Sequence, residues 1–240
     1  MAGHSHWKNI KRKKAVVDAR RGQAWSKVAR LIMIAAKRGA NPDDNLALRY
    51  AIDKARSVNV PSDTIEKAIK KGSGELGGQN FESVLYEGYG PGGVAILADA
   101  LTDNRNRTAG EIRMIFDKHN GALAGTNAVA RMFHKKGVIN IEKSKIEEDK
   151  LIEMALDAGA EDIVSSEEGF EVTTTLQDFE KVRAAIKKAN IEMAHADLMM
   201  IPTQTVASAG DTAEKVQKIV EGLEANDDVQ NVYTNADFAE

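Results

Sequence analysis

The sequence predicts an α+β protein of three domains: an N-terminal three-helix domain plus two α+β domains, one of them ferredoxin-like and inserted in the other. Three observations support this prediction. Apolar residues recur at helical spacing up to residue 72 and at a spacing closer to that of strands after residue 80. A glycine-rich stretch at 72–78 separates these regions. The elements expected over 137–201 follow the order β-α-β-β-α-β, which is typical of a ferredoxin-like domain.

Three short helices are expected in the N-terminal region. The first carries an apolar stripe from Trp25 to Ala35 and ends at Gly39. The second opens at Asn41-Pro42-Asp43, and the third starts at Pro61-Ser62-Asp63 and stops at Gly72. Residues 1–19 show no clear apolar face, so we expect an arm that is flexible or ordered by a partner.

The rest of the chain is expected to form strands and helices in alternation. Residues 84–89 and 93–101 are expected strands, followed by a helix over 108–120 that a Thr108…Glu111 capping box opens, and by a strand over 129–134. A helix over 212–224 and a strand over 229–234 look like missing partners for residues 80–135. The predicted domains are therefore 1–78, 79–136 together with 202–240, and the inserted 137–201.

Composition excludes several classes of protein. The chain has no cysteine, which removes disulfides, thiolate zinc sites and cysteine nucleophiles. No apolar run is long enough to span a membrane, and the N-terminus lacks the apolar core of a secretory signal, so we expect a cytoplasmic protein. His4 and His6 have no carboxylate or thiolate neighbours, so no metal is expected. Without a catalytic constellation, we expect no enzyme activity, no cofactor and no small-molecule substrate.

Charge is distributed unevenly along the chain. The net charge is −3, yet residues 1–72 hold 17 Lys and Arg against 6 Asp and Glu, whereas the remainder holds 16 against 30. This asymmetry indicates a basic module for a polyanion joined to an acidic body. Because the acidic body would repel nucleic acid, we expect the basic end to make the contact.

The basic arm and the first helix hold the candidate contacts. Clustered cations neutralise phosphates, and an indole beside them can stack on an unpaired base. On a helical wheel, the cations of the first helix fall opposite its apolar stripe. The alternatives are a solubilising tail for the arm and a solvated face for the helix. The candidate residues are Trp7, Lys8, Lys11, Arg12, Lys13, Lys14, Arg20, Arg21, Lys27, Arg30, Lys37 and Arg38.

Two other segments have features of phosphate or anion sites. The glycine-rich loop from Gly88 to Gly93 lacks the Gly-Lys-Ser/Thr ending of a phosphate loop and leads into a strand, so we interpret it as a turn that needs positive φ. Arg105 and Arg107 lie close to an expected helix start and form a candidate anion site. The alternative for this pair is helix capping and salt bridges into the acidic body.

Four segments together resemble one protein family. They are MAGHSHWKNIKRKK, then AxxDARRGxxxSKxxRxIxxAAKxG, then YEGYGPGG and TDNRNRT. In this order they are similar to the YebC family of probable transcriptional regulators, and the resemblance covers essentially the whole chain. It implies a helical N-terminal domain and two α+β domains, one ferredoxin-like and inserted in the other.

The resemblance implies two functions. Some members of the family are described as DNA-binding transcription regulators, whereas mitochondrial relatives are translational activators and bacterial members have been linked to stalled ribosomes. Our leading expectation is a DNA-binding regulator, and the alternative is a ribosome- or RNA-associated translation factor. The same basic arm and helix serve both, because phosphate contacts carry no sequence information.

Overall fold

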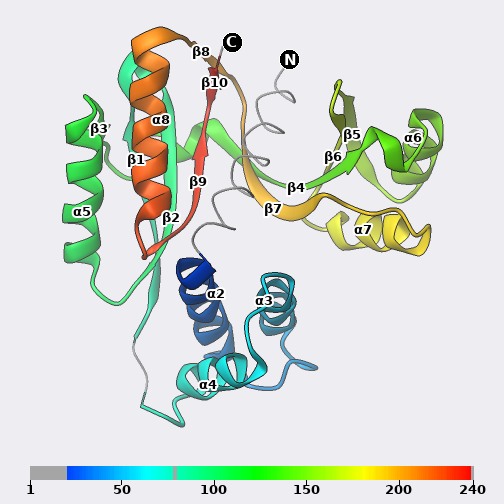
Figure 1. Ribbon diagram of the computed structural model, residues 1–240, viewed down its shortest axis with the longest axis horizontal. Helices are drawn as coiled ribbons and strands as arrows, with labels where there is room; N and C mark the ends of the chain where they lie inside the picture. The colour runs from blue at the N-terminus through cyan, green and yellow to red at the C-terminus, as the bar shows by residue number, and fades with distance from the viewer. Residues whose placement is uncertain (1–20, 78–79, 239–240) are drawn as a thin grey trace. The chain divides into compact units, whose positions relative to one another are not determined.

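The computed structural model describes residues 21–77 and 80–238, with the backbone alone for Arg21. These residues form two compact units, drawn in Figure 1. Among the described residues, one unit comprises 21–130 and 210–234, and the other comprises 131–209 and 235–238. The predicted α+β class is confirmed, whereas the predicted contacts from Trp7 to Arg20 lie outside the described residues.

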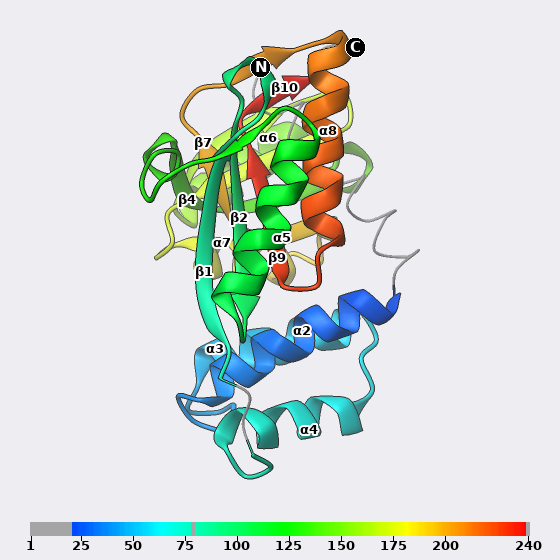
Figure 2. The same cartoon turned by 90° about the vertical axis from the view of Figure 1, so that its left-hand side faces the viewer.

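The N-terminal helical domain contains α2 (Arg21–Ala36), α3 (Leu46–Ser57) and α4 (Ser62–Ser73), with α2 packed against both of the others (Figure 2). Ile32, Leu48 and Ala55 are completely buried in its core. Gly72 brings α4 close to α2, since a Cβ at this position would lie 2.3 Å from the carbonyl oxygen of Met33. The three-helix prediction is therefore confirmed.

The predicted start of the second helix and the predicted end of the third need correction. The second helix begins at Leu46 rather than directly after Asn41, because the Asn45 side chain accepts a hydrogen bond from the Leu48 amide at 3.1 Å. The same side chain donates to the carbonyl of Ala35 at 2.8 Å and so closes the end of α2. The third helix continues past Gly72 to Ser73, and Gly74 ends it with φ 90°.

The middle domain is built on a sheet of order β3-β1-β2-β9. Its strands are β1 (Glu82–Tyr89), β2 (Ala95–Thr102), β3 (Ala122–Leu123) and β9 (Val229–Thr234). Helices α5 (Arg105–Lys118) and α8 (Gly210–Ala225) lie side by side on one face (Figure 2). The elements expected to complete this domain from the tail do so, because β9 pairs with β2.

Two local features of the middle domain bear on the sequence predictions. Gly92 and Gly93 have φ of 74° and 75°, which confirms the turn after β1. The predicted Thr108…Glu111 capping box is wrong, since α5 starts at Arg105 and the Asn104 side chain accepts from the Arg107 amide at 3.1 Å. Thr108 is fully buried within the helix instead.

The inserted unit contains β4 (Phe133–Glu142), α6 (Glu148–Asp157), β5 (Ala160–Ser165), β6 (Gly169–Thr174), α7 (Phe179–Lys188) and β7 (His195–Pro202). Its sheet has the order β5-β6-β4-β7 with antiparallel neighbours, which is the ferredoxin-like arrangement. The short strands β8 (Val206–Ser208) and β10 (Ala236–Phe238) pair in parallel. The ferredoxin-like insertion is confirmed; domain boundaries at 78, 136 and 201 stay a prediction.

Candidate nucleic-acid interface

Three cations predicted to face nucleic acid contact the middle domain. The Lys27 ammonium donates to the carbonyl of Glu224 at 2.7 Å. The Arg30 guanidinium donates to the carbonyl of Asp227 and forms a salt bridge with Asp228 at 2.9 Å. The Lys37 ammonium donates to the carbonyl of Phe81 at 2.9 Å. These cations therefore attach α2 to the middle domain, and a role for them in binding nucleic acid stays a prediction.

The end of α8 explains why α2 presents polar groups here. The last carbonyls of a helix lack partners within the helix and carry partial negative charge, which favours nearby donors and cations. Gln23 donates to the carbonyl of Ala225 at 2.5 Å, beside the bond from Lys27 to Glu224. In effect, side chains of one helix cap the C-terminus of another.

Asp228 joins several elements of this unit. Its side chain is 4% exposed, and one carboxylate oxygen accepts from Thr108 at 2.6 Å and from Arg107 at 2.6 Å. Thr102 donates to the same oxygen at 3.2 Å, while Arg30 pairs with the other oxygen. Burial alone would raise the pKa of Asp228, but the bonds from Thr108 and Arg107 and the charges of both arginines hold it below its usual range.

The predicted anion site at the start of α5 is rich in acidic partners. Besides its bond to Asp228, Arg107 pairs with Asp103 at 3.1 Å, and Arg105 lies 3.8 Å from Glu82. A hollow of about 430 Å³ adjoins Arg30, Arg107, Glu111 and residues 225–228. The structure thus contains the salt bridges of the alternative interpretation, and anion binding by Arg105 and Arg107 stays a prediction.

Exposed cations without ion pairs lie elsewhere on the helical domain. Lys67, Lys70 and Lys71 of α4 are exposed, and within the described part of the chain none forms an ion pair. Arg38, just after α2, is also exposed. The α4 lysines were not among the predicted contacts, although their i, i+3 and i+4 spacing places them together on one helix face.

A second buried carboxylate organises a loop of the middle domain. Glu87 of β1 is 3% exposed and accepts hydrogen bonds from the amides of Asn127, Val129 and Ala130, each at 2.7 Å. Burial raises the pKa of Glu87, yet these three bonds outweigh it and leave the pKa lowered. This role of Glu87 could not be predicted from the sequence, because an acidic residue within a strand usually indicates an exposed position.

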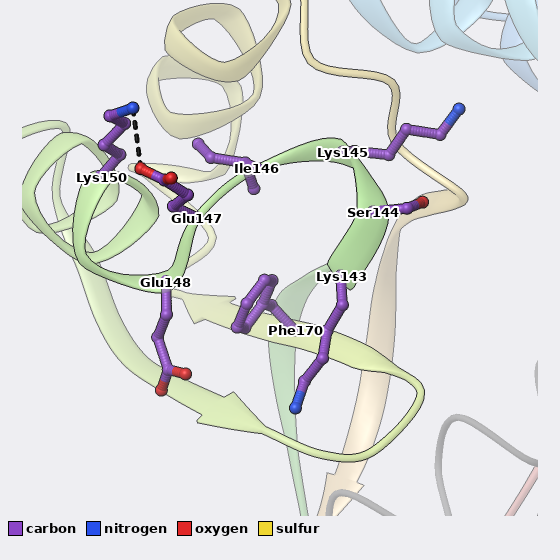
Figure 3. Close-up of a pocket in the computed structure, with 8 residues that line it drawn as sticks. All are labelled: Lys143, Ser144, Lys145, Ile146, Glu147, Glu148, Lys150 and Phe170. Atoms are coloured by element: carbon purple, nitrogen blue, oxygen red, sulfur yellow. Dashed lines mark ion pairs between the residues drawn. The ribbon is translucent and has the colours of Figure 1, made fainter.

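A further hollow of about 630 Å³ lies beside α6 in the inserted unit. Figure 3 shows Phe170 amid the charged residues that line it, with Glu147 and Lys150 paired at 2.8 Å. Lys145 pairs with Glu192 at 2.6 Å. No group of His, Asp and Glu suited to a metal ion occurs in residues 21–77 and 80–238. No helix in these ranges is long and apolar enough to cross a membrane.

The fold defines a class of protein: a three-helix domain joined to an α+β domain that carries a ferredoxin-like insertion. Residues 5–75 match the family description "TACO1/YebC protein N-terminal domain". Residues 81–236 match "TACO1/YebC second and third domain". The chain belongs to the TACO1/YebC family, which confirms the resemblance found in the sequence.

Relatives match along almost their full length. A protein of Pelotomaculum thermopropionicum is 50% identical over 238 residues, covering 98% of each chain, and one of Natranaerobius thermophilus is 51% identical over 242 residues, covering 99% of this chain and 97% of the relative. Both carry the name "Probable transcriptional regulatory protein". The crystal structure of a conserved hypothetical protein from Aquifex aeolicus is 42% identical, with a TM-score of 0.84 and 93% coverage of both chains.

Proposed function

We propose that this protein is a DNA-binding transcriptional regulator that contacts DNA mainly through its basic N-terminal arm. The observation that carries the proposal is the charge distribution, with 17 Lys and Arg against 6 Asp and Glu in residues 1–72. The relatives named as probable transcriptional regulatory proteins support a regulatory role. Lys8, Lys11, Arg12, Lys13 and Lys14 would bind phosphates, and Trp7 would stack on a base.

The described residues suggest how the helical domain takes part. Lys27, Arg30 and Lys37 hold α2 on the middle domain, so the proposal assigns them to positioning rather than to DNA. The exposed Arg38 and the α4 lysines are available to extend the contact beyond the arm. Such contacts fix position on the duplex without reading its sequence.

The test is the salt dependence of DNA binding. Replacing Lys11, Arg12, Lys13 and Lys14 by alanine should weaken binding and flatten the slope of log affinity against log salt by about 0.9 per lost phosphate contact. The control removes the same charge by Ala substitution of the exposed Lys118, Lys143, Lys187 and Lys188. An unchanged slope in the arm variant, or an equal loss in the control, would contradict the arm as the contact.

A further inference from the structure

One face of the ferredoxin-like sheet is not covered by its helices. The core beneath α6 and α7 contains Ile139, Ile141, Phe170 and Val172, so the alternate residues of these strands point to the opposite face. Strand register aligns two rows of residues across that face. One row is Val164, Glu171, Asn140 and His195, and the next is Asp162, Thr173, Val138 and Asp197.

Two acceptors at the centre of this face lack a cationic donor among the described residues. Glu171 is 9% exposed, and it accepts a hydrogen bond from the Asn140 amide nitrogen at 3.2 Å. Asn140 is fully buried, and its Oδ1 has no hydrogen-bond partner within residues 21–77 and 80–238. Burial, with the charge of Asp162, raises the pKa of Glu171 to about 7 despite the bond from Asn140. An unpaired buried carboxylate and an unsatisfied acceptor both cost free energy.

The chemistry of this face specifies the kind of group that would satisfy it. Asp162 and Asp197 add two carboxylates beside the Glu171–Asn140 pair. One oxygen of each already accepts from the following backbone amide, at 2.9 Å for Asp162 and 2.8 Å for Asp197. An ammonium or guanidinium group supplies several donors and a positive charge, so a segment rich in Lys and Arg complements both the charge and the unsatisfied acceptor.

We propose that, without nucleic acid, this acidic face binds the protein's own basic arm, residues 8–14. The arm supplies Lys8, Lys11, Arg12, Lys13 and Lys14 within seven residues. The twenty residues before Arg21 can span up to about 65 Å when extended, so this segment is long enough for the arm to bind far from Arg21. If the arm binds DNA as proposed above, docking competes with DNA, since one set of cations cannot hold carboxylates and phosphates together.

A spin label on the arm tests this docking directly. Because the chain has no cysteine, Asn9→Cys gives one labelling site and leaves every arm cation in place. In the full-length protein without nucleic acid, the label should broaden the amide signals of Asn140 and Thr173 more strongly than that of Lys187 on α7. Absent broadening, or equal broadening on both faces, would overturn the proposal.

Matched variants test whether the broadening depends on the carboxylates of this face or only on the arm lying nearby. Asp162→Asn with Glu171→Gln should abolish the broadening and tighten DNA binding at least threefold, because the competing site is lost. Glu153→Gln with Asp157→Asn makes the same two kinds of substitution at exposed positions of α6 and should alter neither readout. Equal effects of the two pairs would contradict the proposal.

Two further outcomes distinguish failure of the docking proposal from failure of the proposed DNA-binding function. Adding duplex DNA should remove the broadening; if the arm docks but the protein binds no DNA, docking stands and the proposed function fails. If the four-alanine arm variant flattens the salt slope while no broadening is seen, the proposed function stands and docking fails. Mixing spin-labelled chains with separately isotope-labelled chains tests whose arm binds the face. Broadening in that mixture would show that the arm of a second copy binds there and would overturn intramolecular docking.

Discussion

At the scale of single residues, Asp228 receives donors from three parts of the fold. Thr102 lies on β2, Thr108 and Arg107 lie on α5, and Arg30 lies on α2. Removing one member of a buried ion pair leaves charge without compensation, which is more costly than removing an exposed pair. The carboxylate of Asp228 therefore stabilises the attachment of the helical domain as well as the start of α5.

We expect Asp228→Ala to lower the free energy of unfolding by about 3 kcal/mol. Urea denaturation measures the loss. Glu214→Gln is the control, because Glu214 is 71% exposed and lies 4.0 Å from Lys218, a geometry typical of pairs that contribute little. A loss below about 1 kcal/mol for Asp228→Ala would contradict the assigned role.

The lowered pKa of Asp228 gives this loss a pH dependence. A carboxyl group with a lowered pKa in the folded state stabilises the fold above its unfolded pKa, and that stability disappears as pH falls through the folded value. The difference between wild type and Asp228→Ala should therefore be complete at neutral pH and shrink below about pH 4. A difference that grows with acidity would contradict the assignment.

Residue patterns on α2 show what a sequence can and cannot reveal about the site. The helical wheel separated Lys27, Arg30 and Lys37 from the apolar stripe correctly, as the burial of Val28, Ile32 and Ala35 shows. It could not show that the partners would be the carbonyls of Glu224 and Phe81 and the carboxylate of Asp228, which lie far along the chain. A cation for a phosphate and a cation for a helix C-terminus look the same in sequence.

At the scale of elements, helix existence was easier to predict than helix ends. The apolar spacing identified all three N-terminal helices, whereas two starts depended on competing asparagine and threonine caps. Asn45 and Asn104 cap the helices whose predicted starts are Asn41 and Thr108. Asparagine and threonine side chains can both accept a hydrogen bond from a helix amide, so tertiary contacts decide which of these residues does.

Replacing a helical glycine by alanine should have opposite effects on stability at two positions. Gly72→Ala should destabilise the helical domain, because the new Cβ would meet the carbonyl oxygen of Met33 at 2.3 Å. Gly110→Ala on α5 should stabilise the protein by about 0.5–1 kcal/mol, since alanine favours helix and the site has no atom within 4 Å. Thermal unfolding of both variants measures the signs. Stabilisation by Gly72→Ala would contradict the close packing of α4 on α2.

At the scale of the whole molecule, the proposed DNA contact offers few groups for reading bases. Asn9 and Gln23 are the only Asn or Gln on the predicted arm and first helix. The side chain of Gln23 already donates to the carbonyl of Ala225 and, at 3.0 Å, to Asp227. Sequence discrimination on duplex DNA requires side chains that reach base edges, so this surface favours phosphates over bases.

We therefore expect weak discrimination between DNA sequences. In a competition assay at physiological salt, a proposed promoter fragment and a scrambled fragment of equal length should differ by less than about a hundredfold, or ~2.7 kcal/mol. A larger preference would contradict this prediction and support direct readout of a promoter. A ratio near one, together with saturable binding to ribosomes, would favour the alternative function in translation.

The insertion also fixes the order in which the protein can be completed during synthesis. Strand β2 emerges from the ribosome before the ferredoxin-like unit, yet its partner β9 emerges only after that unit and α8. Until then, the apolar run of β2 has an open edge, and open edges invite pairing with other chains. The interval taken to translate the insertion is thus a window of aggregation risk, which ends when β9 joins the sheet.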